Sequence, residues 1–437
     1  MKKASHNAPV AVRTVDISRT LIPIDNLSAY RSCRVYVFDG TRLLGMVEIE
    51  NMRQTISPAR LRDVIAEQLY WQLGKRWMGA HPYEPELSLI EGRIPGTAAE
   101  ASSGLPASVS VSIALATFDR PQQLRECLKA LCAQESPRRV EVVVVDNHPS
   151  SGLTPPVVKD FPGVVLVSEQ RQGLAYARNA GFVRSSGDII IATDDDVIMP
   201  PDWVEKLVAP FERSDVGVVT GNVLPRELET ESQYLFEAYG GLGRGFEGKK
   251  VGPSWLRRSR RRAAPTWKLG ATANAAFRAA VFRNPEIGLM DEALGPGMPS
   301  GVGEDTYLFY KIIKAGYSLV YQPDAYVWHT HRRDPAALRK QIYDYSKGHV
   351  SYHLTTLLRD RDRRALFRLL VELPRDYLRR IYRRLRGRSE YPVSLILLEI
   401  RGNLAGPWSL WKSRRRVARE GRSEFPTATG TGIPSAE

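Results

Sequence analysis

The chain has 437 residues, 43% of them apolar and 9% aromatic, which is enough for one large core with appendages. Its net charge is +14, and residues 332–422 alone contain 24 Lys and Arg against 9 Asp and Glu, so the basicity belongs to the C-terminal part. Three cysteines without metal-ligand spacing favour a reducing compartment, the first 11 residues lack the apolar core of a signal peptide, and no apolar run approaches the ~20 residues of a bilayer span.

The N-terminal part is predicted to form a small α+β module over residues 21–90. Residues 33–49 contain two strand-like stretches around an Asp-Gly pair, which is the pattern of a β-hairpin. A helix is expected over residues 58–73, with Ser57 as its N-cap and a proline in its first turn. The module contains no cluster of catalytic residues, so we assign it a packing or partner-binding role.

Three segments are predicted to lack regular structure. Residues 91–107 are rich in Gly, Pro, Ala and Ser, which is typical of a linker. Residues 1–20 and 423–437 are predicted to be disordered.

From residue 108 to residue 332, strand patterns alternate with helix patterns, which predicts an α/β domain. We expect strands at 109–117, 140–147, 164–167, 187–193 and 216–223, and helices at 121–133, 174–184 and 202–213.

The strand that begins near Gly187 ends in three consecutive carboxylates, Asp194, Asp195 and Asp196. Ligands of parallel sheets bind outside the carboxyl ends of the strands, so these side chains are expected at a binding cleft. Because side chains alternate along a strand, Asp194 and Asp196 point the same way, and oxygen ligands of this kind suit Mg²⁺ or Mn²⁺. The alternative interpretation is an acidic turn that caps the helix near Asp202.

Several motifs follow one another in an order that resembles the family 2 glycosyltransferases, inverting enzymes of the GT-A fold. The resemblance covers residues 109–332. It is based on Ile113–Arg120, Val145–Asn147, Gly173–Gly181, Asp194–Asp196, Gly270–Arg278, Gly303–Asp305 and His329. It implies a GT-A nucleotide-diphospho-sugar transferase with a mixed central sheet.

The resemblance implies a divalent cation, Mn²⁺ or Mg²⁺, on the diphosphate of the sugar donor. Asp194 and Asp196 correspond to its carboxylate ligands in the family. A histidine supplies a third ligand in many relatives, and His329 matches this position best, although His331 lies on the same side of an extended segment. An imidazole beside two carboxylates suits Mn²⁺ somewhat better than Mg²⁺.

The remaining donor-binding positions are also implied by the resemblance. Asp146 would accept a hydrogen bond from N3–H of a pyrimidine, although it could instead cap a helix. Arg178 would either neutralise the diphosphate or pair with Asp194. Thr117 and Arg120 would border the nucleotide, Gly270 would permit close backbone approach, and Asn274 would bond a sugar hydroxyl.

An inverting transferase needs one general base to deprotonate the acceptor hydroxyl. The aspartate of the family's Glu-Asp motif has this role, so the resemblance makes Asp305 the base and leaves Glu304 to orient the acceptor. The alternative is that both carboxylates only stabilise the N-terminus of a helix.

Residues 333–422 are predicted to form basic amphipathic helices with aromatic residues near Arg and Lys. This composition is typical of elements that lie on an anionic membrane surface, and there is no nucleic-acid-binding motif. A solvated helical cap is the plainer alternative.

The sequence therefore predicts a metal-dependent inverting glycosyltransferase that passes a sugar from a nucleotide donor to a hydroxyl acceptor, a glycan or a lipid-linked glycan. We expect it in cell-surface polysaccharide or glycolipid synthesis, peripheral at the inner face of the cell membrane. The alternatives are a nucleotidyltransferase on a related fold, which would not need a base at Asp305, and a non-catalytic membrane-binding scaffold.

Overall fold

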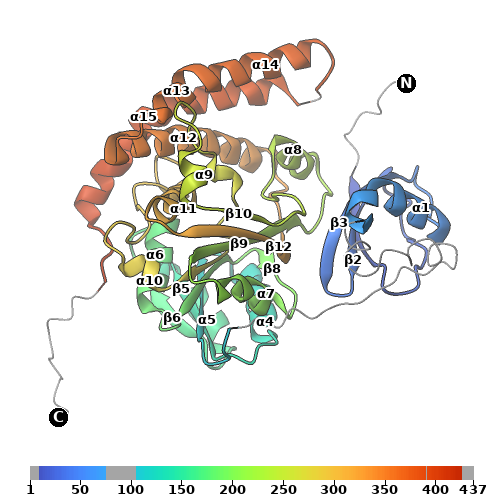
Figure 1. Ribbon diagram of the computed structural model, residues 1–437, viewed down its shortest axis with the longest axis horizontal. Coiled ribbons are helices and arrows are strands. Elements are labelled where there is room, and N and C mark those ends of the chain that lie inside the picture. The colour runs from blue at the N-terminus through green and yellow to red at the C-terminus, as the bar shows by residue number, and fades with distance from the viewer. Residues whose placement is uncertain (1–8, 75–104, 390, 426–437) are drawn as a thin grey trace.

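The computed structural model describes residues 9–74, 105–389 and 391–425 (Figure 1). A central α/β domain lies between a small N-terminal module on one side and a layer of C-terminal helices on another. This arrangement confirms the predicted mixed sheet, N-terminal module and helical extension.

In the described part of the chain, nine strands form the large sheet, and eight of them follow the spatial order β10-β12-β9-β11-β7-β4-β5-β6. Strands β7, β4, β5 and β6 run parallel, whereas β11 is antiparallel to both of its neighbours, so the sheet is mixed. The strands are β4 (Val111–Thr117), β5 (Val140–Asp146), β6 (Val165–Ser168), β7 (Ile189–Asp194), β8 (Val197–Ile198), β9 (Val216–Pro225), β10 (Lys249–Val251), β11 (Asn274–Arg278) and β12 (Ser318–His329).

Helices pack on both faces of this sheet. The helices of the domain are α4 (Pro121–Cys132), α5 (Thr154–Lys159), α6 (Leu174–Arg184), α7 (Trp203–Val208), α8 (Glu231–Tyr239), α9 (Pro253–Arg257), α10 (Ala280–Arg283) and α11 (Glu304–Lys314). The helix expected over residues 202–213 is shorter than predicted, because its last turn is a 3₁₀ segment, Ala209–Glu212, that contains Pro210.

The apolar run of β7 is explained by burial on both faces. Ile189 and Ile191 point into a core shared with α4 and α7, whereas Ile190 and Ala192 point into a second core shared with α6 and α11. A strand covered on both sides reads as a continuous hydrophobic run. The two cores fix the strand, and with it the position at which its aspartates begin.

The N-terminal module contains a three-stranded sheet of β1 (Val10–Asp16), β2 (Ser32–Asp39) and β3 (Arg42–Glu50), with helix α1 (Pro58–Gln68) packed against it. Ser57 accepts a hydrogen bond from the Arg60 amide, as expected of an N-cap. The prediction that residues 1–20 are disordered is wrong for β1, which pairs in parallel with β2. Residues 75–104, which contain most of the expected linker, and 426–437 lie outside the described residues.

The module is docked on the α/β domain. Tyr36 and Phe38 of β2 pack on Leu224 of β9 and on Tyr326 and Trp328 of β12. The rings of Tyr36 and Trp328 meet edge to face, with their centroids 5.2 Å apart. The docked surface therefore includes the end of β12, directly before His329.

The C-terminal extension consists of α12 (Pro335–Asp360), α13 (Arg364–Phe367), α14 (Leu373–Leu385) and α15 (Val393–Glu420). Helices α12 and α15 pack very closely, since a Cβ on Gly406 would lie 2.6 Å from Cβ of Val350. Helix α14 has no buried residue. Among the described residues, no helix combines the length and the apolar character needed to cross a bilayer.

Candidate active site

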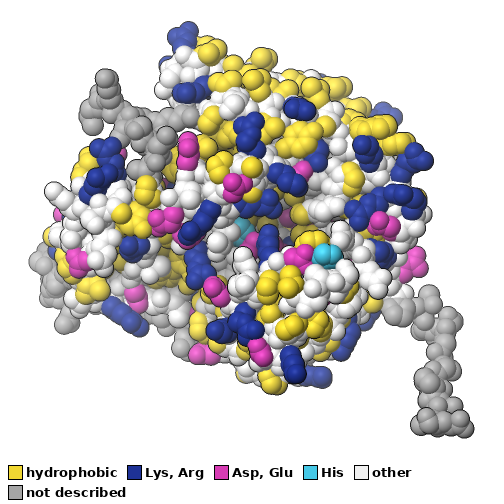
Figure 2. Space-filling view, turned by 180° about the vertical axis from the view of Figure 1, so that it is seen from behind, with side chains coloured by type: hydrophobic (Ala, Val, Ile, Leu, Met, Phe, Trp, Pro, Cys, Tyr) yellow, Lys and Arg dark blue, Asp and Glu magenta, His cyan; other side chains and the backbone are white. Residues whose placement is uncertain are grey.

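A cleft of about 1340 Å³ opens at the carboxyl ends of β4 and β7. Figure 2 shows a central hollow in the molecule in which basic, acidic and histidine side chains are visible together. Of the predicted site residues, the cleft is lined by Thr117, Arg120, Arg178, Asp194, Asp196, Gly270, Glu304, Asp305 and His329. Asp146 and Asn274 are not part of its lining.

The three aspartates after β7 have three different environments. Asp194 accepts a hydrogen bond from Nη2 of Arg178 at 2.6 Å. Asp195 is 4% exposed and accepts hydrogen bonds from Thr117 Oγ1 and Arg120 Nη1. Burial and the neighbouring Asp196 raise the pKa of Asp195. Thr117 and Arg120 thus hold the turn itself.

One oxygen of Asp196 has the properties of a cation ligand. Oδ2 accepts a hydrogen bond from Arg120 Nη1 at 2.8 Å. Oδ1 is buried without a hydrogen-bond partner among the described residues, and it lies 3.4 Å from Nε2 of His329. Carboxylate oxygen and imidazole nitrogen are both good ligands for Mn²⁺, so these two atoms fit such an ion.

The predicted three-ligand set is not assembled. No group of three His, Cys, Asp or Glu side chains in the described residues is close enough together to hold a metal. Asp194 pairs with Arg178 and does not form a three-ligand group with Asp196 and His329. His331 lies behind His329, with its Nδ1 2.7 Å from Nδ1 of His329, and therefore does not face Asp196.

Arg178 connects the two halves of the cleft. Its side chain on α6 donates to Asp194 through Nη2 and to Glu304 Oε1 through Nη1 at 3.0 Å. Glu304 also accepts a hydrogen bond from the amide of Gly303. Burial, followed by the charge of Asp305, raises the pKa of Glu304 to about 7. Both expected roles of Arg178 remain compatible with this position.

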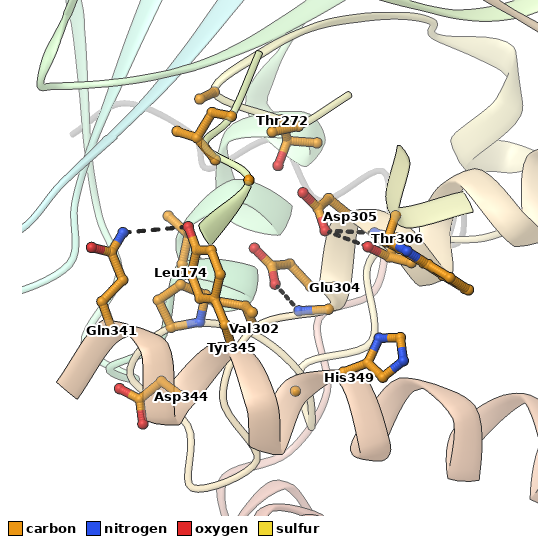
Figure 3. A pocket seen from close by; sticks show the side chains of 18 of the residues that line it. Leu174, Thr272, Val302, Glu304, Asp305, Thr306, Gln341, Asp344, Tyr345 and His349 are labelled. Carbon is orange, nitrogen blue, oxygen red and sulfur yellow. Dashed lines mark hydrogen bonds between the residues drawn. The ribbon is translucent and has the colours of Figure 1, made fainter. Parts of the chain in front are cut away.

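Asp305 stands beside Glu304 at the first turn of α11, and Figure 3 shows both carboxylates at the cleft. Its Oδ1 accepts hydrogen bonds from the amide and hydroxyl of Thr306, at 2.6 and 3.2 Å. Oδ2 makes no hydrogen bond within the described residues. One oxygen of Asp305 is therefore fixed by its own helix while the other remains available.

Next to the cleft, β5 ends in a buried carboxylate, and an exposed aromatic ring follows β4. Asp146 is 1% exposed, its Oδ1 accepts a bond from the amide of His148, and its Oδ2 is buried without a partner in the described residues. Phe118 is 44% exposed, lines the cleft, and stacks on His148 with centroids 5.0 Å apart. Phe118 was not predicted, although it directly follows the first strand.

Asn274 corrects a prediction. It is fully buried at the start of β11, where its Nδ2 donates to the carbonyls of Asn222 and Ala325 and its Oδ1 accepts from Trp203 Nε1. Both the amide nitrogen and the amide oxygen of Asn274 are thus bonded within the fold. Asn274 therefore joins strands and a helix and is not placed to bind a sugar.

Gly270 does lie at the cleft, and its backbone explains why it is a glycine. Its φ is +133°, and a Cβ at this position would lie 2.5 Å from Cβ of Thr220. A side chain is excluded both by conformation and by space.

The C-terminal extension forms a wall of the cleft that sequence reasoning missed. Figure 3 shows Gln341, Asp344, Tyr345 and His349 of α12 along the side facing α11. The spacing of these polar and aromatic residues on one helix face was an available signal. Arginines of α14 line the outer part, namely Arg379, Arg380 and Arg383.

The chain is similar in sequence to known glycosyltransferases. Residues 112–285 match the family model described as Glycosyl transferase family 2. An N-acetylglucosaminyltransferase of Azorhizobium caulinodans is 24% identical over 236 residues, which are 51% of this chain and 55% of that protein. Succinoglycan biosynthesis protein ExoM of Rhizobium meliloti is 25% identical over 230 residues, or 50% of this chain and 66% of that protein.

The chain spans about half the length of the curated relatives it matches. Among solved structures, the mannosyltransferase PcManGT from Pyrobaculum calidifontis, in complex with GDP-Man and Mn²⁺, has a TM-score of 0.42 at 19% identity. That similarity covers 82% of this chain and 84% of the other.

Proposed function

We propose that the protein, whose residues 112–285 match the model of glycosyltransferase family 2, is a metal-dependent inverting glycosyltransferase. It transfers a sugar from a nucleoside diphosphate to a hydroxyl group of a glycan or lipid-linked glycan in cell-surface polysaccharide or glycolipid synthesis. The observation that carries the proposal is the link through Arg178, which brings Asp194 of the donor side and Glu304 of the acceptor side to one cleft.

The donor nucleotide would bind between β4 and β5. The unpartnered Oδ2 of Asp146 suits a base N–H, and the exposed ring of Phe118 suits stacking against the base. Asp196 Oδ1 and His329 Nε2 would hold the divalent cation, with Asp194 next to them on the diphosphate side. When bound, such an ion neutralises the charge that develops on the leaving diphosphate.

The acceptor would bind between α11 and α12. Its hydroxyl oxygen attacks the anomeric carbon while the bond from that carbon to the diphosphate oxygen breaks. Oδ2 of Asp305 accepts the hydroxyl proton, because Oδ1 is already engaged by Thr306. Glu304, held by Arg178 and the Gly303 amide, keeps this carboxylate and the acceptor in position.

The proposal is tested by measuring nucleoside diphosphate release from a panel of nucleotide sugars with Mn²⁺ or Mg²⁺. We expect one donor to be turned over by the wild type and at least ~10²-fold more slowly by Asp305→Asn, with donor binding unchanged. Thr306→Val is the matched control, since it removes one partner of Asp305 and leaves the base. Pyrophosphate release would point to a nucleotidyltransferase instead, and unchanged activity in Asp305→Asn would exclude the base.

We further propose that α14 and α15 attach the protein to an anionic membrane surface at the inner face of the cell membrane. Leu378, Tyr382 and Leu385 form an exposed stripe on α14, and a second stripe on α15 includes Leu404 and Trp408. Figure 2 shows hydrophobic side chains along the edge where Figure 1 places these helices, with Lys and Arg beside them. Apolar stripes flanked by basic residues complement anionic lipid.

Vesicle flotation tests this attachment. Vesicles with a third of phosphatidylserine should carry the full-length protein at low salt, whereas neutral vesicles should carry much less. Leu378→Ser with Leu385→Ser should weaken flotation, and the exposed pair Ile22→Ser with Met52→Ser on the N-terminal module is the matched control. Equal flotation on both vesicle types, or no effect of the α14 changes, would contradict the proposal.

A further inference from the structure

A chain of side chains connects the cleft to the N-terminal module. Nδ1 of His329 lies 2.7 Å from Nδ1 of His331, and Nε2 of His331 lies 3.0 Å from Oε1 of Glu237 on α8. The other oxygen of Glu237 accepts a hydrogen bond from Nη1 of Arg34, on β2 of the module, at 2.8 Å. Three segments that are distant in the sequence therefore meet in one continuous series.

The direction of each hydrogen bond in this series follows from the bond that Arg34 donates to Glu237. A guanidinium only donates and a carboxylate only accepts, so Glu237 can only receive a proton from His331 Nε2. A neutral imidazole has one N–H, so His331 Nδ1 accepts and His329 Nδ1 donates. The remaining nitrogen of His329, Nε2, then carries a lone pair.

The cleft end of the series agrees with this assignment. With the proton of His329 on Nδ1, its Nε2 has no N–H to donate, and Asp196 Oδ1 would receive no hydrogen bond from it. This oxygen has no hydrogen-bond partner among the described residues, although the two atoms are 3.4 Å apart. Two electron-pair donors thus face each other across a space that suits a cation.

The module also holds the strand on which His329 lies. Trp328 packs edge to face on Tyr36, and residues of β2 and β3 share a hydrophobic cluster with β12. His331 is 2% exposed and its ring meets Phe236 edge to face, so it has little freedom to turn. Packing sets the place of the rings, and the hydrogen bonds set their tautomers.

We propose that Arg34 and Glu237 are positioning residues that, through His331, keep the cleft-facing nitrogen of His329 free of a proton and ready to bind a divalent cation. Partners behind a metal-binding histidine orient the ring and select its tautomer in this way. The N-terminal module is then a part of the metal site and not only a packing or partner-binding appendage. This inference rests on the proposed metal-dependent function.

Glu237→Gln is the decisive substitution because it keeps the shape and reverses the polarity. Arg34 only donates, so it draws the amide oxygen to itself and turns the amide NH₂ toward His331. Nε2 of His331 must then accept, its proton moves to Nδ1, and the proton of His329 moves to Nε2. We expect Mn²⁺ affinity to fall by about 10- to 100-fold, the usual effect of removing such a partner.

The measurement is a titration of full-length protein with Mn²⁺ alone, followed by electron paramagnetic resonance of the free ion. Glu48→Gln is the matched control, because Glu48 pairs with Nε and Nη2 of Arg34, whereas Glu237 pairs with Nη1. It should bind Mn²⁺ within two-fold of the wild type. A loss of the same size in both variants would mean that the module acts only through its own stability, which would overturn the inference.

Nitrogen NMR of ¹⁵N-histidine-labelled protein reads the tautomers without any metal. In the wild type we expect the proton of His331 on Nε2 and that of His329 on Nδ1, with both moved in Glu237→Gln. Unchanged tautomers or unchanged Mn²⁺ affinity in a folded Glu237→Gln would refute the inference. If this variant does not fold, His331→Asn should bind Mn²⁺ more tightly than His331→Leu, since only the amide can accept from His329, and equal binding would refute it.

The inference and the proposed function fail in different ways. A wild type that binds no Mn²⁺ would remove the metal from the proposed function, whereas the NMR result would still show whether Glu237 selects the tautomers. A wild type that binds Mn²⁺ as tightly as Glu237→Gln would refute only the inference.

Discussion

Asp194 and Glu304 are held by opposite ends of one guanidinium, with Arg178 Nη2 2.6 Å from the first and Nη1 3.0 Å from the second. The side chain of Arg178 is 2% exposed. A point charge such as Lys cannot bond two carboxylates in this forked geometry. A single residue therefore holds Asp194 and Glu304 together across the cleft.

Arg178→Met should destabilise the protein by about 3–5 kcal/mol, because it leaves the buried Glu304 without its counter-charge. Adding Glu304→Gln should restore part of this stability, since the second substitution removes the unpaired charge. Transfer activity should remain at least ~10²-fold reduced in both, because neither restores the link. Urea unfolding and steady-state kinetics check the two expectations. Recovery of activity in the double variant would show that the link has no catalytic role.

Asn274→Ala should lower the stability of the protein without weakening its binding of the nucleotide sugar. The substitution removes three buried hydrogen bonds and leaves the Trp203 Nε1 and two carbonyls unpaired, which costs about 2–4 kcal/mol. KM for the nucleotide sugar should stay within two-fold in the folded variant. A raised KM with unchanged stability would instead support the original prediction that Asn274 binds the sugar.

Phe118→Ala should weaken binding of the nucleoside diphosphate by about tenfold, within the range expected for stacking of a base on an aromatic ring. Phe118→Tyr is the conservative control and should bind as the wild type does. Isothermal titration calorimetry with the diphosphate and Mn²⁺ provides the comparison. If Phe118→Ala binds equally well, the base does not lie against this ring.

Two histidines on α12, the buried His353 and the half-buried His349, should make the protein sensitive to acid. Burial, followed by the charge of Arg368, lowers the pKa of His349 to about 3, and burial lowers the pKa of His353 well below its usual value. Unfolded histidines bind protons as the pH falls through about 6.5, whereas these two do not, so the unfolded state gains protons and stability falls with pH.

At pH 5.5 each such histidine should cost about 1.4 kcal/mol relative to pH 7.5. Neither nitrogen of His353 has a hydrogen-bond partner among the described residues, so His353→Leu should fold and should lose less stability on acidification. Chemical unfolding of both proteins at the two pH values makes the comparison. An equal loss in wild type and variant would contradict this account.

The sequence predicted those parts of the site that depend on local patterns. The Ile-rich run of β7 placed the aspartates at the end of a buried strand, and α6 has the predicted bounds. The predicted hairpin of β2 and β3 was likewise specified by its turn.

What the sequence did not predict depends on partners that are distant along the chain. β1 is a strand because it pairs in parallel with β2 and bonds to Leu228, and neither partner is adjacent to it. Asn274 has the residue type of a sugar ligand, but its side-chain amide is hydrogen-bonded to Trp203 and Ala325. Asp194 pairs with Arg178 of α6, which is one of the two roles expected of that arginine, and it does not form a three-ligand group with Asp196 and His329.

The docked N-terminal module has a consequence for synthesis on the ribosome. The module has its own core, so it can fold once about its first 75 residues have emerged. Leu228, Glu237 and Trp328, which it covers in the finished protein, are made much later. During that interval Tyr36, Phe38 and Leu43 have no cover from their later partners in the α/β domain. The series of side chains from Arg34 to His329 is therefore completed late in biogenesis, when a preformed module docks on newly made chain.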